Sequence, residues 1–508
     1  MQNLKQLFKK ISINNKKRDA LIGFNDGDSL SYEDLDNISN KICNFLWSIK
    51  IEKEDVIIIF HDKSSFAYCL MIACIKMGVI YTCLDRKSPY NRLKKIINTC
   101  SPKLIFSYDK FSHDGITIVD YQKDNFKNVT LNGFESELNH DIEVNLDDPV
   151  YIMFTSGSTG FPKGVLISNE NLINFINWTK YGIGINKTDR LTALNPPYFD
   201  NSVFDFFASI FNGASLICIK SDLLINPKML IRFLNTTKPT IWFSVPSLLV
   251  YLLNLRAFLK NDLKSLEKFI FGGEGFPKNH LKKLWDLYGD DKTFINVYGP
   301  TECTCICSSY IVKSKDLKSH ELLPLGKMNK GFKSLILNQK GLITKDNEVG
   351  ELLIGGPNVG IGYFNNIDKT NEAFINNPFK KLSNERYYKS GDLVYFNNKE
   401  NLLYFVGRKD NQIKRMGYRI ELEEIENAFS SIVEIKECAV ISKNIEDKVE
   451  IIACLASGSI ISKKDLINEL KKNIPNYMIP DRFEEFKSLP KNANGKIDRL
   501  TLKKMLVE

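Results

Sequence analysis

Short apolar runs and amphipathic stretches alternate along the first four hundred residues. Runs of β-branched and other apolar side chains at 56–60, 104–106, 216–219 and 269–271 predict buried strands, and the pattern at 64–77 predicts a helix. Alternation of buried strands with helices is typical of α/β proteins whose sheets are largely parallel. The pattern therefore predicts a large α/β domain in which helices sandwich mostly parallel sheets.

The pattern changes near residue 408. A strand-like segment ends at Gly407, a short polar stretch follows, and then come a helical pattern, a pair of strand-like segments and a second helical pattern. This α+β order spans about a hundred residues, enough for a small independent domain. We place the boundary at Asp410, with a large domain at residues 1–409 and a small C-terminal domain at 410–508. The alternative is a surface turn within one continuous domain.

Composition and charge are those of a soluble globular protein with more than one hydrophobic core. The chain has 508 residues, of which 43% are hydrophobic and 25% charged. Its net charge of +9 comes from 69 basic and 60 acidic residues, without the compact basic cluster that nucleic-acid binding requires. The most apolar region, 66–84, is broken by Lys76 and Gly78, so it predicts a buried helix and strand and no membrane span.

Eleven cysteines are spread along the chain. The lysine-rich start, residues 1–19, is not followed by an apolar stretch of signal-peptide length, so we expect a reducing, cytoplasmic environment. Cys303, Cys305 and Cys307 alternate in a strand-like segment and are expected to share one face of it. Ordinary packing is the interpretation we favour for these three thiols, and metal binding is the alternative.

Residues 151–164 carry the strongest chemical signal. An apolar strand runs into a loop of hydroxyls and glycines that closes on Pro-Lys-Gly. Glycines let backbone N–H groups converge, hydroxyls add donors and Lys163 adds positive charge, a combination that suits a polyphosphate. The loop lacks the Gly-Lys-Ser/Thr ending of a Walker A motif. A merely flexible Ser/Gly-rich loop is the alternative.

This loop resembles the phosphate loop of the adenylate-forming (AMP-binding) superfamily, which includes acyl-CoA synthetases, luciferases and the adenylation domains of nonribosomal peptide synthetases. Further segments match motifs of that superfamily in the same order, up to residue 499. They are Asn-Val-Tyr-Gly-Pro-Thr-Glu at 296–302, Gly-Glu-Leu at 350–352, Tyr-Lys-Ser-Gly-Asp at 388–392, Gly-Arg-Lys-Asp at 407–410, Gly-Tyr-Arg-Ile-Glu-Leu at 417–422 and Asn-Gly-Lys-Ile-Asp-Arg at 494–499. On these motifs the chain is identified as an adenylate-forming ligase.

The resemblance implies a nucleotide site for ATP. Tyr298 offers an aromatic face to the purine, Asn296 can pair with the adenine edge, and Asp392 can accept both ribose hydroxyls. By resemblance Glu302 helps to hold Mg²⁺, a hard ion suited to a carboxylate oxygen, and Thr301 lies beside it. The expected nucleotide-binding residues are Thr155, Ser156, Gly157, Ser158, Thr159, Gly160, Lys163, Gly273, Asn296, Tyr298, Gly299, Asp392, Arg408 and Lys496.

The resemblance also implies a reaction in two halves. A substrate carboxylate attacks the α-phosphate of ATP and releases pyrophosphate, and a phosphopantetheine thiol then attacks the acyl-adenylate and releases AMP. Lys496 would contact the carboxylate and the α-phosphate in the first half, and with Glu302 and Thr301 it forms the expected catalytic set. Between the halves the small mobile domain would rotate about Asp410 and present the segment 417–421.

Residues 197–203 resemble the amino-acid-activating branch of the superfamily, in which an aspartate pairs with the substrate's α-ammonium. Asp200 matches that aspartate, and capping of the helix that follows is the alternative role. The side-chain pocket expected by resemblance is otherwise uncharged, which points to a small or branched aliphatic amino acid such as isoleucine or valine. Its residues are Asp200, Asn201, Phe204, Phe243, Ile270, Gly272, Val297, Cys305 and Ile306.

Several alternatives concern the substrate and the thiol. D-Alanine:carrier-protein ligases are a close rival, but they usually show Cys-Gly-Glu where this chain has Gly272-Gly273-Glu274. No carrier domain follows before Glu508, so we expect the thiol to come from a separate acyl or peptidyl carrier protein, with coenzyme A as the alternative. The surplus of basic residues slightly favours an acidic carrier protein. An acyl- or aryl-CoA ligase and a non-catalytic ATP-binding homologue stay open as other functions.

Overall fold

The computed structural model describes residues 2–23, 29–121, 130–157, 160–289, 291–319, 321–380, 385–445, 448–457, 462–492 and 497–507. The chain divides into two compact units. The first contains Met1–Arg86, Ser101–Met153 and Gly164–Gly407, and the second contains Lys87–Cys100, Phe154–Lys163 and Arg408–Glu508. The second unit thus takes in two earlier segments besides the C-terminal hundred residues, and the domain boundary at Asp410 stays a prediction.

A nine-stranded sheet forms one layer of the first unit. Its order is β15 (Lys327–Met328), β14 (Ser308–Ile311), β13 (Thr293–Tyr298), β12 (Lys268–Gly272), β11 (Ile241–Ser244), β9 (Arg190–Ala193), β10 (Ser215–Cys218), β1 (Asp19–Ile22) and β2 (Leu30–Ser31). The strands from β13 to β1 run parallel, whereas the edge pairs are antiparallel. Strands β10 and β11 are buried along their whole length, which explains their continuous apolar runs.

A seven-stranded sheet forms a second layer. Its order is β18 (Gly362–Tyr363), β8 (Lys163–Ser168), β7 (Pro149–Thr155), β4 (Ile80–Leu84), β3 (Val56–Phe60), β5 (Leu104–Ser107) and β6 (Thr117–Asp120). The strands from β7 to β6 pair in parallel, so the expectation of mostly parallel sheets is confirmed. A third, antiparallel sheet contains β16 (Lys333–Leu337), β17 (Gly350–Gly355), β20 (Arg386–Asn397) and β19 (Phe374–Asn376), with β21 (Leu402–Arg408) beside β20.

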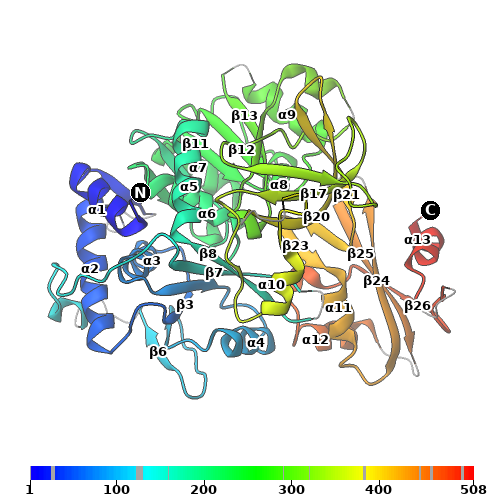
Figure 1. Ribbon diagram of the computed structural model, residues 1–508, viewed down its shortest axis with the longest axis horizontal. Coiled ribbons are helices and arrows are strands. Elements are labelled where there is room, and N and C mark those ends of the chain that lie inside the picture. Colours follow the sequence, from blue (N-terminus) through cyan, green and yellow to red (C-terminus); the bar gives the residue numbers. More distant parts are fainter. Residues whose placement is uncertain are drawn as a thin grey trace. The chain divides into compact units, whose positions relative to one another are not determined.

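Helices pack around these sheets. Those of the first unit are α1 (Leu4–Asn14), α2 (Tyr32–Ser48), α3 (Ser65–Met77), α5 (Asn169–Trp178), α6 (Asn201–Ile210), α7 (Pro227–Thr237), α8 (Pro246–Asn254), α9 (Lys278–Tyr288) and α10 (Ile367–Ala373). Helices α1, α2 and α3 lie against one another (Figure 1). Within the described ranges, none of the helices has the length and apolar character needed to cross a bilayer.

Helix α3 shows how a charged side chain is accommodated in the most apolar part of the chain. The Ser64 side chain caps its first turn, Gly78 ends it with a φ of 65°, and every residue between them is buried. The Lys76 ammonium donates to Asp36 Oδ1 at 2.6 Å, to Ser39 Oγ at 2.7 Å and to Asn40 Oδ1 at 2.6 Å, all in α2. Its burial is tolerated because each of these oxygens replaces water.

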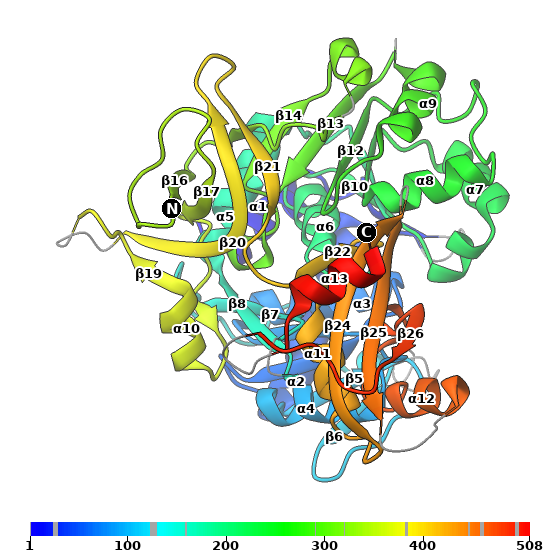
Figure 2. The same cartoon turned by 90° about the vertical axis from the view of Figure 1, so that its right-hand side faces the viewer.

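The second unit contains a three-stranded sheet and a hairpin. Strands β24 (Ile435–Ile445) and β25 (Lys448–Ser457) are antiparallel, β26 (Arg482–Glu485) runs parallel to β25, and β22 (Gln412–Arg415) pairs with β23 (Tyr418–Glu421). The unit's helices are α4 (Tyr90–Cys100), α11 (Leu422–Phe429), α12 (Lys463–Leu470) and α13 (Arg499–Val507). Figure 2 shows β24, β25 and β26 side by side, with α13 against β24. Its core joins α11 and α12 to the sheet.

The three neighbouring cysteines do not share a strand face, so that expectation is wrong. Cys303 ends a short 3₁₀ helix, η6 (Thr301–Cys303), and Cys305 has a φ of 71°. Strand β14 begins only after Cys307. A left-handed residue such as Cys305 turns the chain, so the alternation of side chains that an extended strand would give is lost.

Candidate active site

The predicted phosphate loop lies in the second unit. Thr155 ends β7 and Lys163 begins β8, and the Thr155 hydroxyl donates to the Lys163 carbonyl at 3.5 Å. A Cβ atom at Gly157 would lie 1.9 Å from the Phe161 carbonyl oxygen, and Gly160 has a φ of 75°. The tight curl of this loop therefore requires glycine at both positions. Ser158 and Thr159 lie outside the described residues.

Carboxylates of the second unit reach the donors of this loop. The Gly157 N–H donates to Glu424 Oε2 at 3.2 Å, and the Lys163 ammonium lies 3.9 Å from Glu421 Oε1. Arg92 of α4 forms a buried ion pair with Glu424. Burial opposes charge on Arg92, but Glu424 more than offsets it, so the pKa of Arg92 is raised. In the structure these carboxylate oxygens lie against the N–H and ammonium groups of the loop, and binding of a nucleotide phosphate by the same groups stays a prediction.

Two further contacts fix the same loop. The Ser156 hydroxyl donates to the Arg419 carbonyl at 2.8 Å, and the Lys95 ammonium of α4 donates to the Gly160 carbonyl at 3.0 Å.

In this unit Arg408 also forms a bidentate pair with Asp410, from Nε to Oδ1 at 2.9 Å and from an Nη to Oδ2 at 2.5 Å. Burial would raise the pKa of Asp410, but Arg408 lowers it overall. Arg408, an expected nucleotide-binding residue, and Asp410, the expected hinge, are thus joined by two hydrogen bonds.

The residues expected to hold the nucleoside lie in the first unit. The Tyr298 hydroxyl donates to Asp392 Oδ2 at 2.5 Å, although 94 positions separate them in sequence. Burial, together with the Asp392 charge, raises the pKa of Tyr298 well above its usual value, so this hydroxyl remains a donor. Asn296 donates its side-chain amide to the Pro324 carbonyl at 2.9 Å. A Cβ at Gly299 would lie 2.3 Å from the Cys305 carbonyl oxygen, so this position admits only glycine without rearrangement.

Glu302, the expected metal ligand, is fully buried in the 3₁₀ helix η6, which follows β13. The Tyr363 hydroxyl of β18 donates to its Oε1 at 2.8 Å. The preceding residue, Thr301, donates its hydroxyl to Asp200 Oδ2 at 2.7 Å. Asp200, the expected partner of the substrate ammonium, is therefore hydrogen-bonded to the residue that directly precedes Glu302, the expected metal ligand.

Asp200 occupies the N-cap position of α6, yet its side chain makes no capping hydrogen bond. Instead its carboxylate accepts the Thr301 hydroxyl, as described above. Simple helix capping, the alternative role considered for this residue, is therefore wrong. Asp200 as a residue is half-buried.

The expected side-chain pocket is built from the ends of β11, β12 and β13 and the start of α6. The rings of Phe204 and Phe243 contact each other at a tilt of 58°, with centroids 4.7 Å apart, and Phe243 is the register partner of Ile270. Gly272 pairs with Val297, whose carbonyl oxygen would lie 2.3 Å from an added Cβ. Most of the set is buried, and Asn201 is half-buried beside Gly273. Buried or nearly so are Phe204, Phe243, Ile270, Gly272, Val297, Cys305 and Ile306.

Two protein-family profiles match the chain. One is described as AMP-binding enzyme and covers residues 8–364, and the other is described as AMP-binding enzyme C-terminal domain and covers residues 424–496. The chain belongs to the AMP-binding enzyme family. It is similar to a D-alanine–D-alanyl carrier protein ligase of Bacillus cytotoxicus, with 30% identity over 486 residues that make up 94% of each chain. The expectation of an adenylate-forming ligase that uses ATP is confirmed.

Solved structures share the fold of this AMP-binding enzyme. NpsA-ThdA, an artificially fused adenylation-PCP di-domain of Klebsiella oxytoca, has a TM-score of 0.83 and 22% identity, with 96% of this chain and 94% of that chain covered. The o-succinylbenzoate CoA synthetase of Bacillus subtilis has a TM-score of 0.85 and 22% identity, with 99% and 98% covered. These likenesses confirm the fold class.

Some contacts of this AMP-binding enzyme were not predicted. Lys496 lies outside the described residues, so its position is not tested. Tyr363, Arg92 and Glu424 were missed, because each acts on a residue distant in sequence and none stands out in local pattern.

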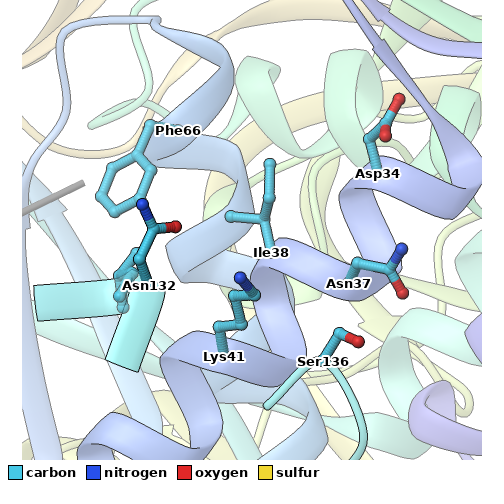
Figure 3. A pocket seen from close by; sticks show the side chains of 8 residues that line it. Asp34, Asn37, Ile38, Lys41, Phe66, Asn132 and Ser136 are labelled. Atoms are coloured by element: carbon cyan, nitrogen blue, oxygen red, sulfur yellow. The ribbon is translucent and has the colours of Figure 1, made fainter. Parts of the chain in front are cut away.

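A separate cavity lies in the first unit and includes none of the expected site residues. It has a volume of about 380 Å³ and is open to solvent. Figure 3 shows its lining from α2, the start of α3 and the segment after residue 130. The lining residues are Asp34, Asn37, Ile38, Lys41, Phe66, Leu131, Asn132 and Ser136. Its polar groups are mostly exposed, and it adds nothing to the site above.

Proposed function

We propose that this enzyme activates a small or branched aliphatic amino acid as its aminoacyl-adenylate and transfers the acyl group to the phosphopantetheine thiol of a separate carrier protein. The observation that carries the proposal is the Asp200 carboxylate, held by Thr301 beside an otherwise uncharged set of side chains. A substrate α-ammonium opposite this carboxylate would form an ion pair with it, whereas the alkyl or aryl group of a fatty or aryl acid could not. The relatives named as D-alanine–D-alanyl carrier protein ligases, at 30% identity, support the same substrate class.

The chemistry divides between two bond changes. The amino acid's carboxylate oxygen forms a bond to the α-phosphorus of ATP as the bond to the pyrophosphate oxygen breaks. The thiol sulfur then forms a bond to the acyl carbon, AMP leaves with the oxygen, and the thiol proton passes to solvent. A carboxylate is already a nucleophile, so the first step needs no proton-abstracting base. Lys496 and the loop at residues 155–163 would supply the positive charge and N–H donors that stabilise negative charge on phosphate oxygens.

Mg²⁺ fits the first unit at Glu302. One carboxylate oxygen accepts the Tyr363 hydroxyl, which orients the group, and carboxylate oxygens are the ligands that this hard ion prefers. Among the described residues no group of three or more side chains forms a metal site. Proteins usually bind Mg²⁺ through one or two carboxylates together with the substrate's phosphates. When bound, the ion would neutralise charge on those phosphates.

The Gly272 position bears on the choice of amino acid. An added Cβ there would meet the Val297 carbonyl oxygen at 2.3 Å, so a cysteine would not fit without movement of the strands. The pocket of this chain therefore differs in its wall from pockets that carry cysteine at this position. We infer that D-alanine is not the best substrate and that the pocket favours a larger aliphatic side chain.

The environment that we propose for the enzyme is a reducing one, such as the cytoplasm. All eleven cysteines lie in the described ranges as thiols, and ten of them are buried. Buried thiols of this kind are usual in reducing compartments.

Amino-acid-dependent pyrophosphate exchange tests the proposal. The panel contains L- and D-alanine, L- and D-valine, L-isoleucine and glycine, with fatty and aryl acids as comparison. We expect an aliphatic amino acid to give the highest rate, and Asp200→Ala to lower its kcat/KM by about 30- to 3,000-fold, the usual cost of removing one member of a buried charge pair. The matching acid without the amino group should lose little. A wild-type preference for a fatty or aryl acid would replace the proposal with a CoA-ligase function.

A further inference from the structure

A buried polar network lies beside the expected side-chain pocket. Asn195 follows β9 and is 5% exposed, and Asp205 lies in α6 and is 2% exposed. The Asn195 backbone N–H donates to Asp205 Oδ2 at 3.1 Å, and its side-chain amide donates to both carboxylate oxygens, at 3.0 and 3.1 Å. One residue at the end of a strand therefore holds both oxygens of a carboxylate on the neighbouring helix.

The same network reaches both phenylalanines of the pocket. Asp205 directly follows Phe204 in α6, and the Asn195 side-chain amide also donates to the Phe243 carbonyl in β11, at 3.2 Å. The two phenylalanine rings contact each other at 4.7 Å between centroids. Because Asn195 is bonded to the helix on one side and to the strand on the other, it fixes the distance between the two elements that carry these rings.

Lys63 supplies the positive charge of the network. It is 2% exposed, and its ammonium donates to the carbonyls of Ala193 and Leu194, both at 2.9 Å. Burial raises the pKa of the Asp205 carboxyl and lowers that of Lys63 to about 8, and the attraction between the two opposes each shift. Lys63 therefore anchors the two residues that precede Asn195 and offsets the charge of Asp205.

We propose that Asn195, Asp205 and Lys63 are positioning residues that set the gap between Phe204 and Phe243, and thereby the size of the aliphatic side chain that the enzyme accepts. This inference rests on the proposed activation of an amino acid. None of the three is among the residues expected to contact the amino acid or the nucleotide. They act through the placement of α6 against β11.

Directional bonds distinguish this network from ordinary apolar packing. A hydrogen-bonded frame keeps one spacing, whereas apolar contacts alone would allow α6 to slide or to collapse towards β11. A single methylene in an apolar enzyme pocket changes selectivity by about 10- to 200-fold, so a small change in spacing has a measurable effect. The frame should therefore influence the choice among aliphatic amino acids more than the rate with ATP.

Side-chain selectivity in pyrophosphate exchange tests the inference. Asp205→Asn keeps the shape of the side chain but replaces an oxygen acceptor that Asn195 uses with an amide donor. We expect the ratio of kcat/KM values for the preferred amino acid over alanine to change by about tenfold, mainly through the KM of the amino acid, with the KM of ATP unchanged within about twofold. Asn195→Ala, which removes the amide alone, should change the same ratio in the same direction.

Lys76→Met is the matched control. Lys76 is a buried lysine of the same unit, and its carboxylate partner is Asp36. Its ammonium donates to residues of α2, none of which belongs to the expected side-chain pocket. This variant should lower the thermal midpoint and leave selectivity unchanged. Unchanged selectivity in Asn195→Ala or Asp205→Asn overturns the inference. The inference is also overturned if both variants fail to fold while Lys76→Met folds. The network would then be required for folding, whereas a network that only sets the size of the pocket would not be. If the wild type activates no amino acid, the proposed function fails first.

Discussion

Glu424→Gln should strengthen the binding of ATP. In the structure the Glu424 carboxylate accepts the N–H of Gly157, a donor that the sequence assigns to a phosphate oxygen. One N–H has one hydrogen, so a phosphate that uses it must displace the carboxylate. The variant keeps the size of the side chain and removes its charge. It thereby weakens the competitor and leaves the buried Arg92 guanidinium to attract phosphate.

The size of the effect follows from the strength of the bond that is exchanged. A hydrogen bond to a charged group contributes about 1.5–3 kcal/mol, and a neutral one roughly half as much. The carboxamide should therefore hold the loop about 1 kcal/mol less tightly, and the KM of ATP should fall about fivefold. Breaking the buried pair with Arg92 should also lower the stability of the second unit, by about 3–5 kcal/mol.

Pyrophosphate exchange at varied ATP concentration measures the first effect, and the thermal midpoint measures the second. Glu423→Gln is the matched control, because it makes the same change of charge on the same helix, at a side chain that accepts from Asn411 at 2.8 Å. A double variant, Glu424→Gln with Arg92→Met, should recover stability. An unchanged or higher KM of ATP in Glu424→Gln, or an equal fall in Glu423→Gln, would refute the competition between carboxylate and phosphate.

Two further predictions concern the two half-reactions. Lys496→Ala should lower adenylate formation by about 10²–10³-fold, the scale of a lost charge contact in the transition state, while transfer from a preformed aminoacyl-adenylate changes far less; an equal loss in both steps would contradict the expected role. Asp410→Pro fixes φ near −65° and removes the pair with Arg408, so one half-reaction should survive while turnover collapses. Full turnover in Asp410→Pro would place the pivot elsewhere.

Much of the fold could be predicted because it depends on local pattern. The helix expected at 64–77 is α3 (Ser65–Met77), since a capping serine and a C-terminal glycine mark its ends in the sequence. The parallel strands are also marked, since burial on both faces requires continuous apolar runs. Family motifs placed Asp200 and Thr301, and the structure joins them at 2.7 Å.

Other features could not be predicted because they depend on pairing across the chain. Arg92 and Glu424 are 332 positions apart, and nothing near either residue indicates a partner. Tyr363 meets Glu302 only because β18 pairs with β8. The prediction of a strand through Cys305 was wrong for a different reason. Two consecutive left-handed residues, Thr304 and Cys305, interrupt the alternation, and side-chain identity did not mark them, since neither threonine nor cysteine favours that conformation.

The bond between Tyr298 and Asp392 links two parts of nucleoside recognition. In the roles proposed for them, the tyrosine ring lies on the purine and the carboxylate binds the sugar, so a hydrogen bond of 2.5 Å joins the base site to the sugar site. Groups that share a hydrogen bond do not contribute independently to binding. Loss of a ribose hydroxyl should therefore cost less affinity in Tyr298→Phe than in the wild type, and the base and sugar contacts should act as one cooperative unit.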